Sequence, residues 1–208
     1  MTNCLTMRLL LLFLLFSCTN VPTGQNDTAQ ATAPASNDFY EKLSNAAILI
    51  TNDHVEYDPT YYQIKYPNGD VPKDRGVCTD VVIRSYRKLG IDLQQLVHVD
   101  MAANFAKYPK SWGLKTTDTN IDHRRVPNLQ VFFTRKGEVK ANSNNATDYK
   151  PGDIVTWMLA GNRPHIGLVV NKKGSNGRYK MVHNIGSGQV IQDCLFEYKI
   201  TGHYRYKK

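Results

Sequence analysis

The sequence predicts one α+β domain in which helices come before an antiparallel sheet. The chain has 208 residues, enough for a single domain with a hydrophobic core but not for two comfortable ones. Apolar residues recur at helical spacing in the first part of the chain, whereas short apolar runs between turn residues fill the region after residue 150. Helices followed by a meander of strands are typical of the α+β class.

Four segments have the pattern of amphipathic helices: residues 39–50, 77–89, 93–108 and 127–135. Asn37 or Asp38 caps the first helix and Asp92 caps the third, because short polar side chains satisfy the free N–H groups of a first turn. Gly90 and Gly137 end the second and fourth helices. The polar stretch between the third and fourth helices is too long for a simple turn, which indicates a functional loop.

The C-terminal part predicts a sheet of about five antiparallel strands. Pro151, Gly152 and Asp153 form a turn into the first strand, and residues 173–177 have the composition of a hairpin turn. The predicted strands cover residues 154–159, 166–171, 178–184, 189–193 and 198–206.

The N-terminus has the features of an exported protein. Residues 1–17 contain an apolar run behind Arg8 that is too short to span a bilayer, as in a secretory signal. The run ends in Leu15-Phe16-Ser17-Cys18, which resembles a lipobox and predicts acylation of Cys18. A plain secretory signal that happens to contain a cysteine is the alternative.

The predicted export defines three parts of the chain and a location. After the signal peptide, residues 18–37 would be a lipidated cysteine followed by a flexible tether, and residues 38–208 the folded domain. Thr19, rather than an aspartate, favours the outer membrane, so we expect a periplasmic lipoprotein anchored there. The net charge of +8 is dispersed and no basic run alternates with aromatic residues, which argues against nucleic-acid binding. A diffuse positive surface fits acidic envelope polymers, or is simply a solvated face. We expect a monomer without a cofactor.

Cys78 lies at the start of the second helix, and two histidines follow on successive predicted strands. His165 precedes Ile166 and Gly167, and His183 ends the next strand. A helix N-terminus and a neighbouring imidazolium both stabilise a thiolate, so Cys78 is the candidate nucleophile, His165 its base and His183 the residue that orients the base. The backbone N–H of Cys78 would face the developing oxyanion. A disulfide between Cys78 and Cys194 is the main alternative in an oxidising compartment.

Four segments together carry a resemblance to a known superfamily. They are the glycine-containing loop before Cys78, the Pro151–Val155 turn and strand, His165-Ile166-Gly167, and the strand ending in His183. The superfamily that they resemble is NlpC/p60. These papain-like cysteine hydrolases cut amide bonds in bacterial cell-wall peptides. The resemblance implies a papain-like fold and assigns the three catalytic roles to Cys78, His165 and His183. It also places Tyr66, about a dozen positions before the cysteine, beside the oxyanion site.

More narrowly, residues 76–86 together with residues 120–129 resemble the bacterial domain-of-unknown-function family 1287. Two features depart from the superfamily pattern. Asp80 follows the cysteine instead of preceding it, and would either bind a substrate amine or balance the charge of the helix N-terminus. The segment with Asp122 and Arg124 has no counterpart; it would either grip substrate carboxylates or be an exposed polar loop.

These observations predict an envelope cysteine hydrolase that cleaves an amide or peptide bond in peptidoglycan stem peptides through a thiol acyl-enzyme. The alternatives are a non-catalytic lipoprotein that binds the wall or a partner through the same cleft, and a papain-like acyltransferase. A zinc site of His123, His165, His183 and Asp122 is the weakest alternative, because the spacing of these residues is not typical of metal ligands.

Overall fold

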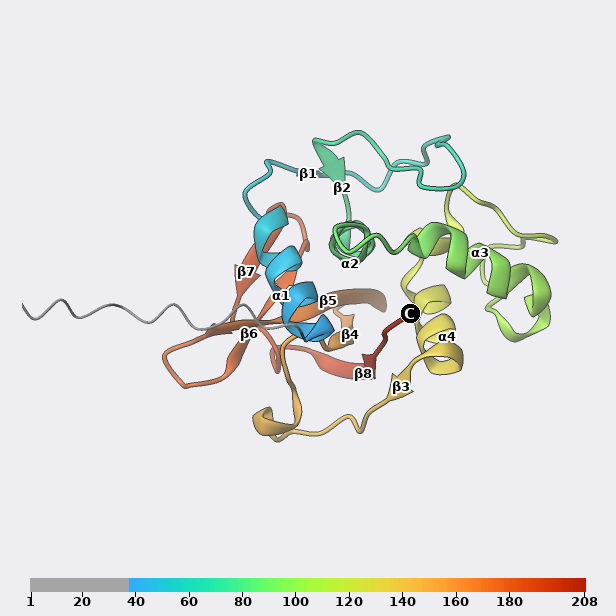
Figure 1. Cartoon of the computed structure of the whole chain (residues 1–208). Coiled ribbons are helices and arrows are strands. Elements are labelled where there is room, and N and C mark those ends of the chain that lie inside the picture. Colours follow the sequence, from blue (N-terminus) through green and yellow to red (C-terminus); the bar gives the residue numbers. More distant parts are fainter. Residues whose placement is uncertain (1–37) are drawn as a thin grey trace, which may run out of the picture. The chain divides into compact units, whose positions relative to one another are not determined.

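The computed structural model describes residues 38–208 (Figure 1). The predicted signal peptide, the lipidation site at Cys18 and the tether lie outside the described residues. Within residues 38–208, no helix combines the length and the apolar character that a membrane span requires.

The helical part agrees closely with the pattern in the sequence. Asp38 caps the first helix by accepting a hydrogen bond from the Tyr40 N–H, and Asp92 accepts in the same way from Gln94. Gly90 has a φ of +75°, the left-handed conformation that lets the chain turn after the second helix. The third helix is shorter than predicted, because a separate 3-10 turn at Phe105–Lys107 follows it. The helices are α1 (Phe39–Ile50), α2 (Cys78–Arg87), α3 (Leu93–Ala103) and α4 (Val126–Lys136).

The sheet has six antiparallel strands in the order β3-β8-β4-β5-β6-β7, one more than the approximate five predicted. The additional strand is a two-residue segment beside β8, too short to give an alternating pattern. A separate parallel pair, β1 (Glu56–Tyr57) and β2 (Arg75–Gly76), lies before α2. The strands of the main sheet are β3 (Glu138–Val139), β4 (Ile154–Leu159), β5 (Arg163–Lys173), β6 (Tyr179–His183), β7 (Val190–Gln192) and β8 (Lys199–Arg205).

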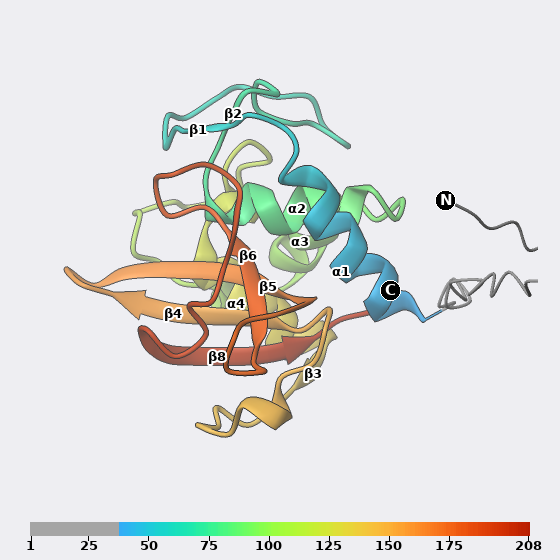
Figure 2. The same cartoon turned by 90° about the vertical axis from the view of Figure 1, so that its left-hand side faces the viewer.

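Each face of the sheet has its own hydrophobic cluster, because successive residues of a strand point to opposite sides. On one face, Ile154, Ile166 and Leu168 pack with apolar side chains of α1, α2 and α4. On the other face, Val155 and Trp157 pack with residues of the segment after β7. Helices α1 and α2 lie beside β5, as Figures 1 and 2 show. The predicted α+β fold, with the cysteine at the N-terminus of a helix packed on an antiparallel sheet, is confirmed.

Candidate active site

The N-terminus of α2 places the Cys78 thiol against the edge of β5. Odd-numbered residues of β5 exchange hydrogen bonds with β4, as the Val169 N–H does with the Asp153 carbonyl, so the N–H of Ile166 points to the opposite side. There it donates to the Cys78 thiol. The sulfur therefore lies at the peptide bond that joins His165 to Ile166. Asn184 tightens this junction, because its side-chain amide donates to the Gly76 carbonyl at 3.3 Å.

The surroundings of the thiol act on its pKa in opposite directions. Burial raises the pKa of Cys78 to about 12, because only 7% of the residue is exposed and the thiolate loses its hydration. The N–H groups of Ile166, Thr79 and Cys78 lower the pKa, whereas the nearby Asp80 carboxylate raises it further. Burial dominates, so the resting form is the neutral thiol and not the expected thiolate. The three N–H groups would stabilise the negative charge once the proton has left.

The two histidines meet across β5 and β6. His165 Nε2 lies 2.9 Å from His183 Nδ1, and both residues are buried. A Cβ at residue 167 would lie 2.8 Å from the Val182 carbonyl oxygen and 3.1 Å from the His183 Cβ. Only glycine leaves this space, so Gly167 allows the His183 ring to reach His165. Trp157 packs beside the His165 ring, at 5.7 Å between ring centroids.

A chain of hydrogen bonds fixes the tautomers of this pair. The Gln192 side-chain oxygen lies 3.1 Å from His183 Nε2, and an amide oxygen only accepts, so His183 Nε2 carries the proton. In neutral His183 the Nδ1 is then an acceptor, and it accepts from the N–H of His165 Nε2. The remaining nitrogen, His165 Nδ1, is left with a free lone pair. That nitrogen is the candidate base.

Burial also keeps both imidazoles neutral. Burial and, to a smaller extent, the adjacent His183 together lower the pKa of His165 to about 3. The pKa of His183 is lowered by burial, although the hydrogen bond to Gln192 opposes this effect. The Cys78 thiol and the His165 imidazole are therefore both neutral at rest.

Buried neutral histidines predict a loss of stability in mild acid. His165 and His123 have folded-state pKa values of about 3, because burial disfavours their charged forms. In the unfolded chain each titrates near 6.5, so the unfolded state takes up protons first as the pH falls. Stability should be fully present above pH 6.5 and fall from there toward pH 3, by about 2 kcal/mol for each histidine at pH 5. Urea unfolding at pH 7, 6 and 5 measures this; an unchanged midpoint would contradict it.

Cys194 does not form the alternative disulfide, because both Cys78 and Cys194 are free. Its sulfur lies 3.5 Å from His183 Nε2, on the far side of the histidine pair from Cys78. Burial raises the pKa of Cys194 to about 12, so it is also a neutral thiol. Within residues 38–208, no three or more His, Cys, Asp and Glu side chains gather in a way that would hold a metal ion.

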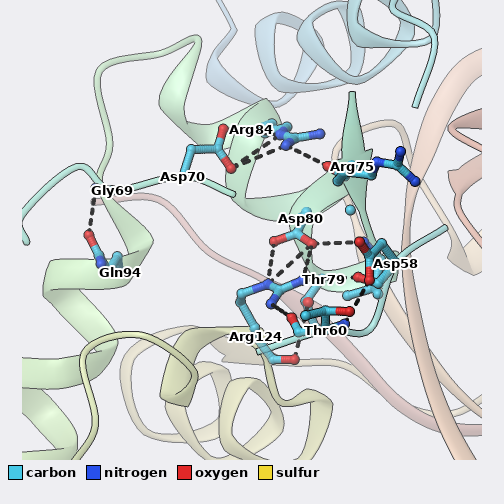
Figure 3. Close-up of polar contacts among 12 residues, drawn as sticks. Asp58, Thr60, Gly69, Asp70, Arg75, Thr79, Asp80, Arg84, Gln94 and Arg124 are labelled. Carbon is cyan, nitrogen blue, oxygen red and sulfur yellow. Dashed lines mark hydrogen bonds and ion pairs between the residues drawn. The ribbon is translucent and has the colours of Figure 1, made fainter. Parts of the chain in front are cut away.

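Arg124 and Asp80, for which substrate binding was one of two alternatives, form a buried ion pair (Figure 3). The Asp80 carboxylate accepts from Arg124 Nε at 3.0 Å and from the Val77 N–H at 2.7 Å. Arg124 also donates to the Thr60 carbonyl at 3.1 Å. Both residues are buried with their polar groups committed, so they fix the loop before Cys78 to the helix. For Asp80, the role at the helix N-terminus is the one the structure supports.

Replacing Asp80 with alanine should destabilise the fold by about 3–5 kcal/mol, because it leaves the buried Arg124 guanidinium without its counter-charge. Chemical denaturation measures the change. The matched control is Glu138→Ala, which removes an exposed carboxylate paired with Lys140 and should cost less than about 1 kcal/mol. Equal losses in the two variants would show that the buried pair contributes no more than a surface pair.

The other two predicted binding residues are also placed away from the thiol. Asp122 is buried and accepts from the Asp118 N–H at 2.6 Å, so it shapes its own loop instead of gripping substrate. Tyr66 packs against His98 of α3, at 5.0 Å between ring centroids, and does not contact Cys78. The tyrosine within electrostatic range of Cys78 is Tyr57, at the end of β1.

Sequence reasoning missed three residues of the site: Tyr57, Asn184 and Gln192. Asn184 follows His183 directly in the sequence, so its place near the site could have been predicted. Gln192 was not recognisable in advance, because its role depends on register: Val190 pairs with His183, and Gln192 lies two residues further on the same face of β7.

Comparisons with known proteins identify the family of the chain. The chain is 53% identical over 150 residues to the uncharacterized protein YijF of Escherichia coli (strain K12). The matched region covers 72% of this chain and 73% of that protein. Two similar solved structures are NlpC1 and NlpC2 from Trichomonas vaginalis, with 18% and 17% identity, TM-scores of 0.44 and 0.41, and coverage of 83% and 81% of this chain. The chain spans about half of each of those proteins, 47% and 48%. The family model described as Domain of unknown function (DUF1287) matches residues 44–206. The resemblance to family 1287 found in the sequence is thereby confirmed, and the chain belongs to this family.

Proposed function

We propose that the protein is a cysteine hydrolase that cleaves an amide or peptide bond through a thioester on Cys78. Two observations carry this proposal: the thiol lies at the His165–Ile166 peptide bond, and the free nitrogen of the His165 ring is fixed by His183 and Gln192. A nucleophile, a base and a residue that orients the base are the groups that acyl transfer needs.

The neutral resting pair implies general-base catalysis. As the sulfur attacks the substrate carbonyl carbon, its proton passes to His165 Nδ1, and the His165–His183 hydrogen bond stabilises the imidazolium that forms. Backbone N–H groups at the first turn of α2 support the negative charge that develops on the carbonyl oxygen. The imidazolium then gives its proton to the leaving amine, which leaves a thioester on Cys78. Water, deprotonated by His165, hydrolyses the thioester and releases the acid and the free thiol.

The substrate class that we propose is the stem peptide of peptidoglycan. The sequence features that support it are the predicted export signal, the lipobox at Cys18 and the net charge of +8, which suits an acidic polymer. The protein would act in the periplasm as a monomer, held at the outer membrane by its lipidated N-terminus. Incubation of purified peptidoglycan fragments with the protein, followed by mass spectrometry, tests this: a mass gain of one water at a defined amide bond is the expected result. Intact fragments would contradict it.

A second candidate, non-catalytic binding of the wall through the same cleft, is favoured by one observation. The Cys78 thiol is almost fully buried and its pKa is raised, which is typical of an unreactive cysteine. An acyltransferase would share the thioester and differ only in its products, because an amine would replace water as the acceptor.

The neutral thiol predicts slow alkylation at neutral pH. Because burial raises the pKa of Cys78 to about 12, the thiolate fraction, and with it the rate of reaction with iodoacetamide, should rise roughly tenfold for each pH unit from 7 to 9. Peptide mass spectrometry of the labelled protein gives the rate at Cys78, and Cys194 serves as an internal comparison. A rate that reaches a plateau below pH 8 would instead indicate a preformed thiolate–imidazolium pair.

A further inference from the structure

A polar cavity of about 630 Å³ lies between the segment that leaves α1, residues 51–57, and the loop after β6, residues 186–189. The two segments run close together at one end of the sheet (Figures 1 and 2). Gly188 makes the close approach, because a Cβ there would lie 2.8 Å from the Val55 carbonyl oxygen and the residue has a φ of +83°. None of the residues assigned above to proton transfer lines this cavity.

Two acceptors in the lining of the cavity, one from Gln189 and one from Asp53, lack a hydrogen-bond partner within the described part of the chain. Gln189 is 6% exposed; its side-chain N–H donates to the Ile50 carbonyl at 2.8 Å, but its buried oxygen Oε1 has no partner. Among residues 38–208, the Asp53 carboxylate also has no hydrogen-bond or ion-pair partner. The other carboxylate in the lining, Glu56, is paired with Arg75. The Gln189 oxygen is a buried acceptor without a donor, which is costly, whereas Asp53 is exposed and adds a negative charge at the cavity. A ligand that supplies donors and a positive charge would satisfy both groups.

The cavity adjoins the candidate nucleophile. Tyr57 lines it and is at the same time within electrostatic range of Cys78. The loop on the opposite side begins directly after His183 and Asn184. Tyr57 and this loop therefore connect the cavity to the segments that carry the candidate site.

We propose that this cavity binds a primary ammonium group of the peptide substrate, with the Asp53 carboxylate and the Gln189 oxygen as its acceptors. An ammonium carries three donors, no acceptor and a positive charge, which matches what the lining lacks. A substrate carboxylate would instead be repelled by the like charge of Asp53 and would leave the Gln189 oxygen without a donor. The inference rests on the proposed function, since it names the class of peptide that the site takes: one with a free amine close to the scissile bond.

The test measures binding and uses Cys78→Ala, so that hydrolysis does not interfere. The probe is the tripeptide Ala-Glu-Lys in three forms: unmodified, acetylated on the α-amine, and acetylated on the lysine side chain. Calorimetry should show that one acetylation weakens binding at least about tenfold, or about 1.4 kcal/mol, and the sensitive form identifies which amine is bound. Asp53→Asn, made in the same background, should abolish that preference. Asp148→Asn, on an exposed turn outside the cavity, should keep it.

Equal binding of all three peptides, or an unchanged preference in Asp53→Asn, would overturn the inference. Hydrolysis by the protein with native Cys78 separates this result from a failure of the proposed function. Cleavage that is indifferent to acetylation would keep the hydrolase and remove the ammonium site. An amine preference in binding without any cleavage would keep the site and remove the hydrolase.

Discussion

Cys78→Ala is expected to abolish hydrolysis of wall peptides, with a loss in rate on the order of 10⁴ or more. The thioester needs a sulfur at the first turn of α2, and the nearest other thiol, Cys194, lies beyond His183 and is not placed to attack the same carbonyl. Mass spectrometry of wall fragments after timed digestion measures the loss. Because the thiol is small and alanine fills most of its space, the variant should fold normally.

Two comparisons make the result specific. Circular dichroism and thermal unfolding should show that Cys78→Ala keeps the native fold, so that lost activity is not lost structure. Cys78→Ser keeps the hydrogen-bonding pattern but has a poorer nucleophile, and it should be almost as inactive. Full activity in Cys78→Ala would leave only the binding role.

Local signals in the sequence predicted the elements of the fold well. Asp38 and Asp92 cap helices by accepting hydrogen bonds from N–H groups two residues further on. Gly90 ends a helix through its own left-handed backbone conformation. These effects depend only on neighbouring residues, so the sequence shows them. The cysteine at a helix start and the histidine pair were predictable for the same reason: strand order and alternation bring His165 and His183 together once β5 and β6 pair.

The parts that the sequence did not predict depend on contacts far apart in the chain. Arg124 looked like a surface cation, but it is buried against Asp80, 44 residues earlier. The order of charges along the sequence cannot show that the two residues are buried together, because their burial depends on the loop that covers them in the folded protein. The same limit applies to the pKa of Cys78: a helix N-terminus favours the thiolate, and only the structure shows that burial is the larger effect.

His165→Ala is expected to give the second largest effect, a loss in hydrolysis rate on the order of 10³. Since Cys78 rests as a neutral thiol, the sulfur cannot attack until a base removes its proton, and the base that we propose is the free lone pair of His165 Nδ1. The fall in rate should be smaller at high pH, because hydroxide then supplies the missing deprotonation. The pH dependence of the rate from 6 to 10 measures this.

Gln192→Leu provides the matched comparison, because it leaves the base in place and removes only the acceptor that fixes its tautomer. Without that acceptor, the proton of His183 is free to occupy either of its ring nitrogens. When it occupies Nδ1, His165 Nε2 no longer has an acceptor for its N–H. The lone pair is then no longer fixed on His165 Nδ1. We expect a loss of roughly tenfold, of the size seen when residues that orient a ligand are removed, without the rescue at high pH. A loss in His165→Ala that is the same at every pH would show that His165 holds the site together but does not take the proton.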